Sequence, residues 1–465
     1  MHNIEISTIK DFPEEEMAKF KELIKTFDSH RMKNIEKNKY YEGKISLSEV
    51  NLGIALPDGL SKLEIGCAWG AKTVDVLAGR SMFDGFVGVN GEEVSEIDKI
   101  AESNNLVDEY IKACRDELKF GCVFATLSDS DEGVKIRFHS PLTAAAIWDG
   151  EKGRIAYGFA IIDTAPDNNH NWTPSIINYY TEDSIWVLTN TVTGWVAKQH
   201  PHKMGRPLME ALIWNATSDK PFGRSRIKEP ERRLIQGFVR TVANASIGLE
   251  FATAPQKYLL GVTDEQFDAL VDNKFRQYVG SILAATTNPE TGEKPSFGQL
   301  QQGTIAPHVE MLRILSTQFS AATGLTVSDT GVVNDANPTS SDAILAQSQT
   351  LIATAQQLNT NNSKGLKNIA LMALAISYNT SLDELTDDQK AIVAHFKNPA
   401  MPSVAVTADA AIKIASARQG FASTDVFLEM LGFDKADIRR IKSQEGRSRG
   451  MALVESVANG NYNAE

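Results

Sequence analysis

Hydrophobic and polar positions change their spacing twice along the chain, and each change predicts a different kind of structure. Residues 13–40 open with Pro and three Glu and continue with mixed charges at helical spacing, which predicts a helix. Between residues 120 and 198 hydrophobic and polar positions alternate with a period of two, which predicts strands joined by short turns. Helical spacing returns beyond Gly223. The chain is therefore expected to have an α+β fold that contains an antiparallel sheet.

The same spacing arguments give the remaining elements. A strand is expected over Met82–Val87 and another over Lys257–Val262. Helices are expected over 93–104, 106–119, Glu229–Phe251, 264–274 and Pro307–Thr323, from Pro338 to about Tyr378, and through most of 383–465.

Length and composition limit the class of protein. A chain of 465 residues is expected to form about two to four domains or subdomains. No run of roughly eighteen apolar residues is present and the N-terminal stretch lacks an apolar core, so neither a membrane span nor a secretory signal is expected. The three Cys have no C-x-x-C spacing, which favours a reduced, cytoplasmic folding environment and argues against structural zinc. A net charge of −12 argues against a protein that grips nucleic acid by its phosphates.

The stretch KLEIGCAWGAKTVDVLAG, residues 62–79, allows two interpretations. It resembles the cofactor loop of S-adenosylmethionine-dependent methyltransferases, in which a glycine-rich turn follows a buried parallel strand and an acidic residue ends the next strand. The segment before the turn is too polar for such a strand, Ala68 replaces the middle glycine, and Asn90 occupies the acidic position. An amphipathic helix that begins near Trp69 and ends near Gly79 is favoured.

Two short clusters of metal-ligand residue types have simpler explanations. Asp129–Gly133 begins like a calcium loop, but the later ligands are missing, so a hairpin turn is favoured. His200 and His202 would need further ligands from elsewhere to hold a metal, so a loop is favoured there.

The predicted long helix lacks charge over much of its length. No charged residue occurs between Ala343 and Ser363, and no basic residue occurs between Ile314 and Ser363. Solvated helices usually carry Lys and Glu, so three explanations remain open: burial in a subunit interface, chance composition, or a surface past which a polyanion slides. One apolar-to-small seam is expected at Ile344, Ser348, Leu351, Ala355 and Leu358.

Several short motifs occur in order between residues 40 and 344: Tyr40-Tyr41-x-Gly43-Lys44, the segment from Trp69 to Arg80 with Phe86 after it, Phe222–Ile227, Ala254-Pro255-Gln256-Lys257 and Asn337–Ile344. Together these motifs and their order resemble the portal proteins of tailed bacteriophages, of the siphophage type. Arg226 stands where an acidic residue is more usual in that family.

The resemblance implies a portal fold: a mixed α/β wing, a two-helix stem, a small α/β clip, a long helix after a tunnel loop, and a helical C-terminal crown. Such proteins form rings of about twelve copies at one capsid vertex, through which double-stranded DNA is packaged and ejected. The implied boundaries are a wing over 1–228, stem helices over 229–254 and 307–323, a clip over 255–306, a tunnel loop over 324–340, a long wing helix over 341–379 and a crown over 380–465.

The resemblance also implies three groups of functional residues. The tunnel loop facing the DNA channel would contribute Thr326, Val327, Ser328, Asp329, Thr330, Asn334, Asp335 and Asn337. A basic cluster, read either as a solvated helix start or as a contact with DNA or capsid, comprises Lys220, Arg224, Arg226, Lys228, Arg232, Arg233 and Arg240. The clip residues expected to dock the connector and terminase are Lys274, Arg276, Thr286, Asn288, Glu290 and Lys294.

The expected partners are further copies of the chain, double-stranded DNA without sequence specificity, the large terminase, a head-completion adaptor, and the major capsid or scaffolding protein. No cofactor and no catalytic activity are expected, because the chain lacks G-x-x-x-x-G-K-[ST] and any evident nucleophile–base pair. The expected location is the portal vertex of the virion, after assembly in the host cytoplasm. The methyltransferase and a non-viral helical scaffold are the alternatives.

Overall fold

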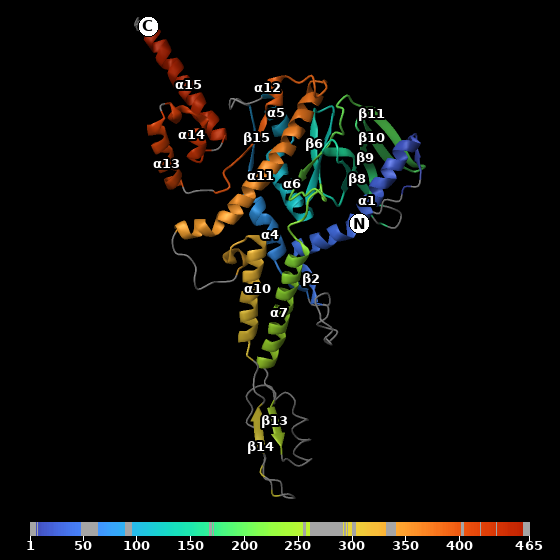
Figure 1. The fold of residues 1–465 in the computed structure, drawn as a ribbon, viewed down its shortest axis with the longest axis vertical. Helices are drawn as coiled ribbons and strands as arrows, with labels where there is room; N and C mark the ends of the chain where they lie inside the picture. Colours follow the sequence, from blue (N-terminus) through green and yellow to red (C-terminus); the bar gives the residue numbers. More distant parts are fainter. Residues whose placement is uncertain are drawn as a thin grey trace. The chain divides into compact units, whose positions relative to one another are not determined.

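The computed structural model describes residues 6, 8–47, 64–88, 95–166, 170, 172–253, 257–260, 292, 294, 296–299, 304–331, 341–400, 404–418, 420–433 and 435–458 (Figure 1). Two compact units emerge from the contacts. The first contains Met1–Ile35, Asp75–Ser225 and Gln349–Glu465, and the second contains Glu36–Val74 and Arg226–Ser348. Three helices contribute residues to both units: α1 (Glu14–Glu42), α4 (Trp69–Ala78) and α11 (Ser341–Ser377). None of the described helices is long and apolar enough to cross a membrane.

A six-stranded sheet dominates the first unit, with the order β1-β11-β10-β9-β8-β7. Five strands follow one another along the chain and pair antiparallel, as the alternation predicts; β1 joins the edge in parallel with β11. The last alternating stretch before residue 198 forms two strands, because a turn with fully exposed Val192 separates β10 from β11. The bounds are β1 Ile9–Lys10, β7 Ala144–Asp149, β8 Arg154–Pro166, β9 Trp172–Tyr180, β10 Ser184–Thr191 and β11 Gly194–Pro201.

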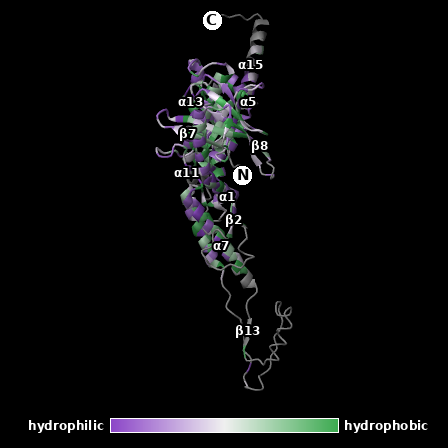
Figure 2. Ribbon diagram, turned by 90° about the vertical axis from the view of Figure 1, so that its right-hand side faces the viewer, coloured by the Kyte–Doolittle hydropathy of each residue, from purple (hydrophilic) through white to green (hydrophobic). Residues whose placement is uncertain are grey.

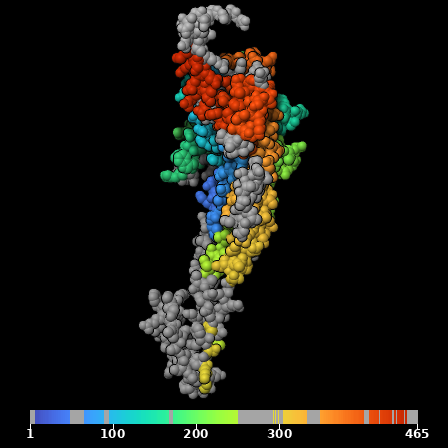
Figure 3. All heavy atoms as spheres, turned by 90° about the vertical axis from the view of Figure 1, so that its left-hand side faces the viewer, coloured from blue at the N-terminus to red at the C-terminus, as the bar shows by residue number. Residues whose placement is uncertain are grey.

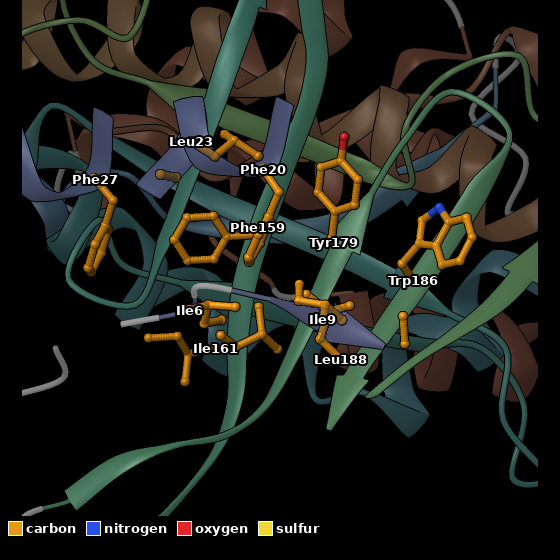
Figure 4. Packing of buried hydrophobic residues seen from close by; sticks show 13 residues of the cluster. Ile6, Ile9, Phe20, Leu23, Phe27, Phe159, Ile161, Tyr179, Trp186 and Leu188 are labelled. Atoms are coloured by element: carbon orange, nitrogen blue, oxygen red, sulfur yellow. The ribbon is translucent and has the colours of Figure 1, made fainter. Parts of the chain in front are cut away.

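One face of this sheet is covered by the first half of α1. Figure 4 shows Phe20, Leu23 and Phe27 of the helix facing the aromatic and aliphatic side chains of the strands. The rings of Phe20 and Phe159 meet edge to face at 5.8 Å, and those of Phe20 and Tyr179 at 5.6 Å. Burial of these large side chains, each stabilising by about 1.5–3 kcal/mol, explains why the charged N-terminal helix is held here.

A smaller antiparallel sheet of the first unit has the order β12-β5-β6 and is packed by α6. Its strands are β5 Cys122–Ser128, β6 Lys135–His139 and β12 Met209–Ile213, the last of which the alternation did not predict. The helices α5 (Ser95–Ser103) and α6 (Leu106–Phe120) match the predicted 93–104 and 106–119. Asp129–Gly133 forms the predicted hairpin turn, with Gly133 N donating to Ser130 O at 2.8 Å.

The C-terminal part of the first unit contains one strand in addition to the helices expected through most of 383–465. After α12 (Asp387–Lys390), strand β15 (Val393–Phe396) pairs antiparallel with β4 (Phe83–Val87). The remainder is helical as predicted, with α13 (Val404–Ala417), η2 (Phe421–Ser423), α14 (Asp425–Met430) and α15 (Lys435–Ala458). Figure 3 shows the atoms of α13 and α14, in orange and red, gathered on one face.

The second unit is built on the pair of helices α7 (Glu229–Thr253) and α10 (Ala306–Thr323). A short 3-10 helix, η1 (Val327–Thr330), packs on α10. Two small antiparallel pairs belong to this unit: β2 (Lys44–Ser46) with β3 (Glu64–Gly66), and β13 (Lys257–Leu260) with β14 (Ser296–Gln299). Figure 2 shows hydrophilic and hydrophobic residues interleaved along α7, as expected of a helix with one packed face.

Candidate functional site

The paired helices α7 and α10 form the centre of the candidate site (Figure 1). Ile235 and Val239 of α7 and Leu315 and Phe319 of α10 are buried. A Cβ on Gly237 would lie 3.2 Å from a Leu315 methyl group, so glycine lets the α7 backbone approach α10 closely. Both helices were predicted from the sequence, and their existence is confirmed.

Trp69 contacts both helices and η1. Its ring packs against Phe238 of α7 at 4.6 Å and Phe319 of α10 at 4.7 Å between centroids. Its indole nitrogen donates to the carbonyl oxygen of Thr330 at 3.0 Å. Because Trp69 is only 3% exposed, both its apolar surface and its polar group are satisfied inside the unit.

The glycine-containing stretch around Trp69 serves the packing of the second unit. Its Glu64–Gly66 segment is a three-residue strand, β3, antiparallel to β2 rather than part of a parallel sheet. A Cβ on Gly70 would lie 2.1 Å from the carbonyl oxygen of Tyr40, so only glycine fits. Burial raises the pKa of the Cys67 thiol to about 11, which keeps it neutral and unreactive. The predicted amphipathic helix is confirmed as α4, and this geometry does not favour the methyltransferase.

Arg226, expected in the surface basic cluster, is buried in the second unit. Its Nε donates to Thr73 O at 2.8 Å and its Nη2 donates to Thr323 O at 2.6 Å. Thr323 is the last residue of α10, so the guanidinium satisfies a carbonyl that the helix leaves open at its C-terminus. Burial lowers the pKa of Arg226 to about 10, so the side chain remains a cation at neutral pH.

The other members of the basic cluster differ in their surroundings. Arg232 pairs with Glu36 and lies 5.7 Å from the Tyr40 ring centre, while Arg233 pairs with Glu229. Arg224 lies 3.4 Å from Asp219. Two lysines, Lys220 and Lys228, are exposed, and Arg240 is half-buried. Three of the seven members are therefore in ion pairs within the chain, and the expected contact of the cluster with DNA or capsid remains a prediction.

The first half of the predicted tunnel loop is ordered as η1. Thr326 and Asp329 form a capping box, in which the Asp329 carboxylate accepts from the Thr326 backbone at 2.9 Å and hydroxyl at 2.8 Å. The Thr330 side chain is buried, and its hydroxyl bonds to Ser316 and Val327 O. Val327 is half-buried and Ser328 is exposed. The remaining loop residues of the prediction, Asn334, Asp335 and Asn337, lie outside the described residues.

Buried amides explain part of the uncharged composition of α11. Asn359 accepts a hydrogen bond from the Ser81 hydroxyl at 2.6 Å, and the Asn362 amide donates to Tyr110 Oη at 3.0 Å and Glu117 Oε2 at 2.7 Å. Glu117 is fully buried, which raises its pKa to about 8. Of the predicted seam, Ser348, Leu351, Ala355 and Leu358 are buried, whereas the side chain of Ile344 lies outside the description.

An uncharged row remains on the exposed side of α11. Its members share exposure and polar or small side chains: Gln349, Thr350, Ala353, Gln356, Gln357, Thr360 and Asn361. Burial within the chain therefore accounts for Asn359 and Asn362 but not for this row.

Other predicted site residues are only partly within the described structure. Of the six clip residues only Lys294 is described, and it is exposed; Lys274, Arg276, Thr286, Asn288 and Glu290 lie outside. His200 lies in strand β11, one residue before its end at Pro201, rather than in the predicted loop, and His202 follows the strand. Among the described residues no group of three or more His, Cys, Asp or Glu is arranged to hold a metal ion.

No family model matches the chain. It is 21% identical over 459 residues to a portal protein of Mycobacterium phage D29, and the match covers 94% of this chain and 90% of that protein. The chain resembles a phage portal protein over nearly its whole length. This agrees with the resemblance seen in the sequence motifs. Similar solved structures include a virion of a native gene transfer agent particle and the neck of such a particle computed with C12 symmetry. These matches have 14% and 13% identity, cover 78% of this chain and 89% of each structure chain, and have a TM-score of 0.45.

Two features of this portal-like chain were not anticipated. The pairing of β15 with β4 joins segments more than 300 residues apart, and four residues of β15 are too few to show a period. The other is a basic stretch on α15, residues 435–449, in which six Lys and Arg stand against two acidic residues. A count of charges along that stretch would have revealed it.

Proposed function

We propose that this chain is the subunit of a portal ring: about twelve copies at one capsid vertex form the channel for DNA packaging and ejection. The observation that carries the proposal is the match to a phage portal protein over 94% of the chain. In this proposal the ring is a component of the virion and assembles in the host cytoplasm.

The domain assignments of the sequence analysis are part of the proposal. Residues 1–228 and 341–379 would form the wing, 229–254 and 307–323 the stem, 255–306 the clip, 324–340 the tunnel loop and 380–465 the crown. Helices α7 and α10 pack against each other, and Trp69 and Arg226 attach them to neighbouring residues. These contacts support a stem that acts as one rigid unit. Rigidity matters because any error in a ring contact is repeated in every copy.

The channel would let DNA pass rather than hold it. About twelve copies at −12 each would carry roughly −144 formal charges, which favours passage over adhesion. The uncharged exposed row on α11 and the exposed hydroxyl of Ser328 support a wall with only weak contacts. Thr326, Asp329 and Thr330 bond within the chain, so their contribution would be to brace the loop rather than to touch DNA.

The proposed partners are the large terminase and a head-completion adaptor at the clip, and the major capsid or scaffolding protein around the ring. The proposal contains no catalytic step for this chain, and the energy for packaging would come from a separate ATPase. The chain lacks the phosphate-binding G-x-x-x-x-G-K-[ST] sequence that such an ATPase needs.

Negative-stain electron microscopy and native mass spectrometry of the purified chain test this proposal. We expect rings with an open central hole and a mass that is a multiple near twelve of 50.9 kDa. Addition of the capsid or scaffolding protein tests for assembly that depends on the head. Monomers or dimers under both conditions would contradict the ring. Saturable binding of S-adenosylmethionine by such particles would favour the methyltransferase instead.

A further inference from the structure

Helix α15 contacts the rest of the described chain mainly through its first turns (Figure 1). Ile438 is 5% exposed, and the Lys442 ammonium pairs with Asp425 at the start of α14. Beyond that point all described side chains from Ser443 to Met451 are exposed. Within the described part of the helix, Ser443–Met451 gain little from packing against the rest of the chain, so a partner that contacts these polar side chains would stabilise them.

The charge of this helix is opposite to that of the rest of the chain. Residues 435–449 contain six Lys and Arg and two Asp and Glu, a net charge of 6 − 2 = +4. The remaining residues carry −12 − 4 = −16. An acidic protein that keeps one exposed basic helix has a local surface suited to a polyanion.

The arrangement of the exposed basic side chains fits phosphate groups. Arg440, Ser443 and Arg447 stand at positions i, i+3 and i+7, which share one face of a helix. Arg440 is 76% exposed and has Asp437 at 3.2 Å; within the described part of the chain, Arg447 has no acidic partner. Arginine forks and serine hydroxyls are common donors to phosphate oxygens.

We propose that α15 binds the phosphate backbone of double-stranded DNA, without sequence specificity, through the face formed by Arg440, Ser443 and Arg447. This rests on the proposed function, because the portal ring is what brings DNA to the chain. The contact of one copy is weak, and the ring sums many copies along one duplex. In the cluster at 220–240 the arginines Arg224, Arg232 and Arg233 each have an acidic partner, whereas Arg447 of α15 has none among the described residues.

The test compares two double variants of the full-length protein. Arg440→Gln with Arg447→Gln removes the proposed contacts, whereas Arg115→Gln with Arg418→Gln removes the same charge from two exposed arginines of the same unit that belong to no proposed DNA contact. Binding of a fluorescent 30-base-pair duplex is measured by anisotropy between about 50 and 200 mM NaCl, with two unrelated sequences. Native mass spectrometry reports the oligomeric state of each variant.

We expect both duplexes to bind equally, and the α15 variant to lose about ten-fold in affinity with a shallower salt dependence. The matched variant should bind like the unmodified protein. Unchanged binding by the α15 variant, or equal losses in both variants, would overturn the assignment. Loss of ring assembly by the α15 variant alone, with DNA binding retained, would show that the helix meets an acidic surface of a neighbouring copy instead. Failure of the unmodified protein to form rings counts against the proposed function, and the anisotropy then tests α15 separately.

Discussion

The indole nitrogen of Trp69 donates to the carbonyl oxygen of Thr330 at 3.0 Å, although 261 residues separate them in the sequence. The same ring is packed by Phe238 and Phe319. A residue that first looked like part of a cofactor loop is therefore the point at which α4, both long helices of the second unit and η1 meet.

Replacement of Trp69 by Phe keeps an aromatic ring but removes the donor to Thr330. We expect a loss of about 1–3 kcal/mol in the free energy of unfolding, because a buried carbonyl loses its partner. Urea unfolding followed by circular dichroism measures the change. Trp172→Phe, at a position that is 57% exposed, is the control and should change stability by less than about 0.5 kcal/mol. Equal effects of the two variants would contradict the role given to the indole N–H.

Gly70→Ala tests the close approach of α4 to the end of α1. The new methyl carbon would lie 2.1 Å from Tyr40 O, a backbone atom that cannot rotate away. We expect destabilisation by more than about 3 kcal/mol, or failure to fold. Gly66→Ala is the matched control, since nothing lies within 4 Å of its added carbon. A Gly70→Ala protein as stable as the control would show that the approach is looser than described.

The sequence predicted the elements that depend on neighbouring residues, but not the contacts between residues that lie far apart along the chain. Local spacing was enough for α1, α6, α7, α10 and most strands of the large sheet, because period and turn residues are local signals. The pairing of β15 with β4 and the parallel edge strand β1 escaped, because both are short and their partners lie far away in the sequence. The same reason applies to Arg226. Its sequence neighbours are basic and suggested a surface cluster, while the carbonyls it satisfies come from distant residues.

Arg226→Met should destabilise the second unit through α10. The carbonyls of Thr73 and Thr323 both lose a charged donor, and the bond to Thr73 is buried, so the loss costs about 2–3 kcal/mol. Arg226→Lys should recover only part of this loss, because one ammonium cannot reproduce the two-pronged guanidinium contact. Arg233→Met, at a side chain that is 72% exposed, is the control and should change stability by less than about 0.5 kcal/mol. Thermal unfolding of the four proteins measures these differences. If Arg226→Met leaves the stability unchanged, the structural role given to Arg226 is wrong, and the residue is again a candidate member of the surface basic cluster.

Glu117 makes the stability of the first unit depend on pH. Its pKa is about 8 in the folded chain because of burial, against an ordinary value of 4.5. Between these values the folded chain holds a proton that the unfolded chain has released, so stability falls as pH rises, by up to about 1.4 kcal/mol per pH unit. The facing groups Tyr110 and Cys114 also have pKa values raised by burial, so they remain neutral over this range.

The geometry agrees with a protonated Glu117. Its Oε1 and the Oδ1 of Asn362 are both buried and have no hydrogen-bond partner among the described residues, and a proton on the carboxyl adds a donor where only acceptors remain. Glu117→Gln supplies a permanent donor of the same shape. We expect this variant to gain stability over the unmodified protein progressively from pH 5 to pH 8, as measured by urea unfolding at each pH. Glu109→Gln, at a partly exposed side chain of the same helix that pairs with Lys112, should show no such trend. A difference between Glu117→Gln and the unmodified protein that stays constant with pH would mean that Glu117 carries its charge in the folded chain.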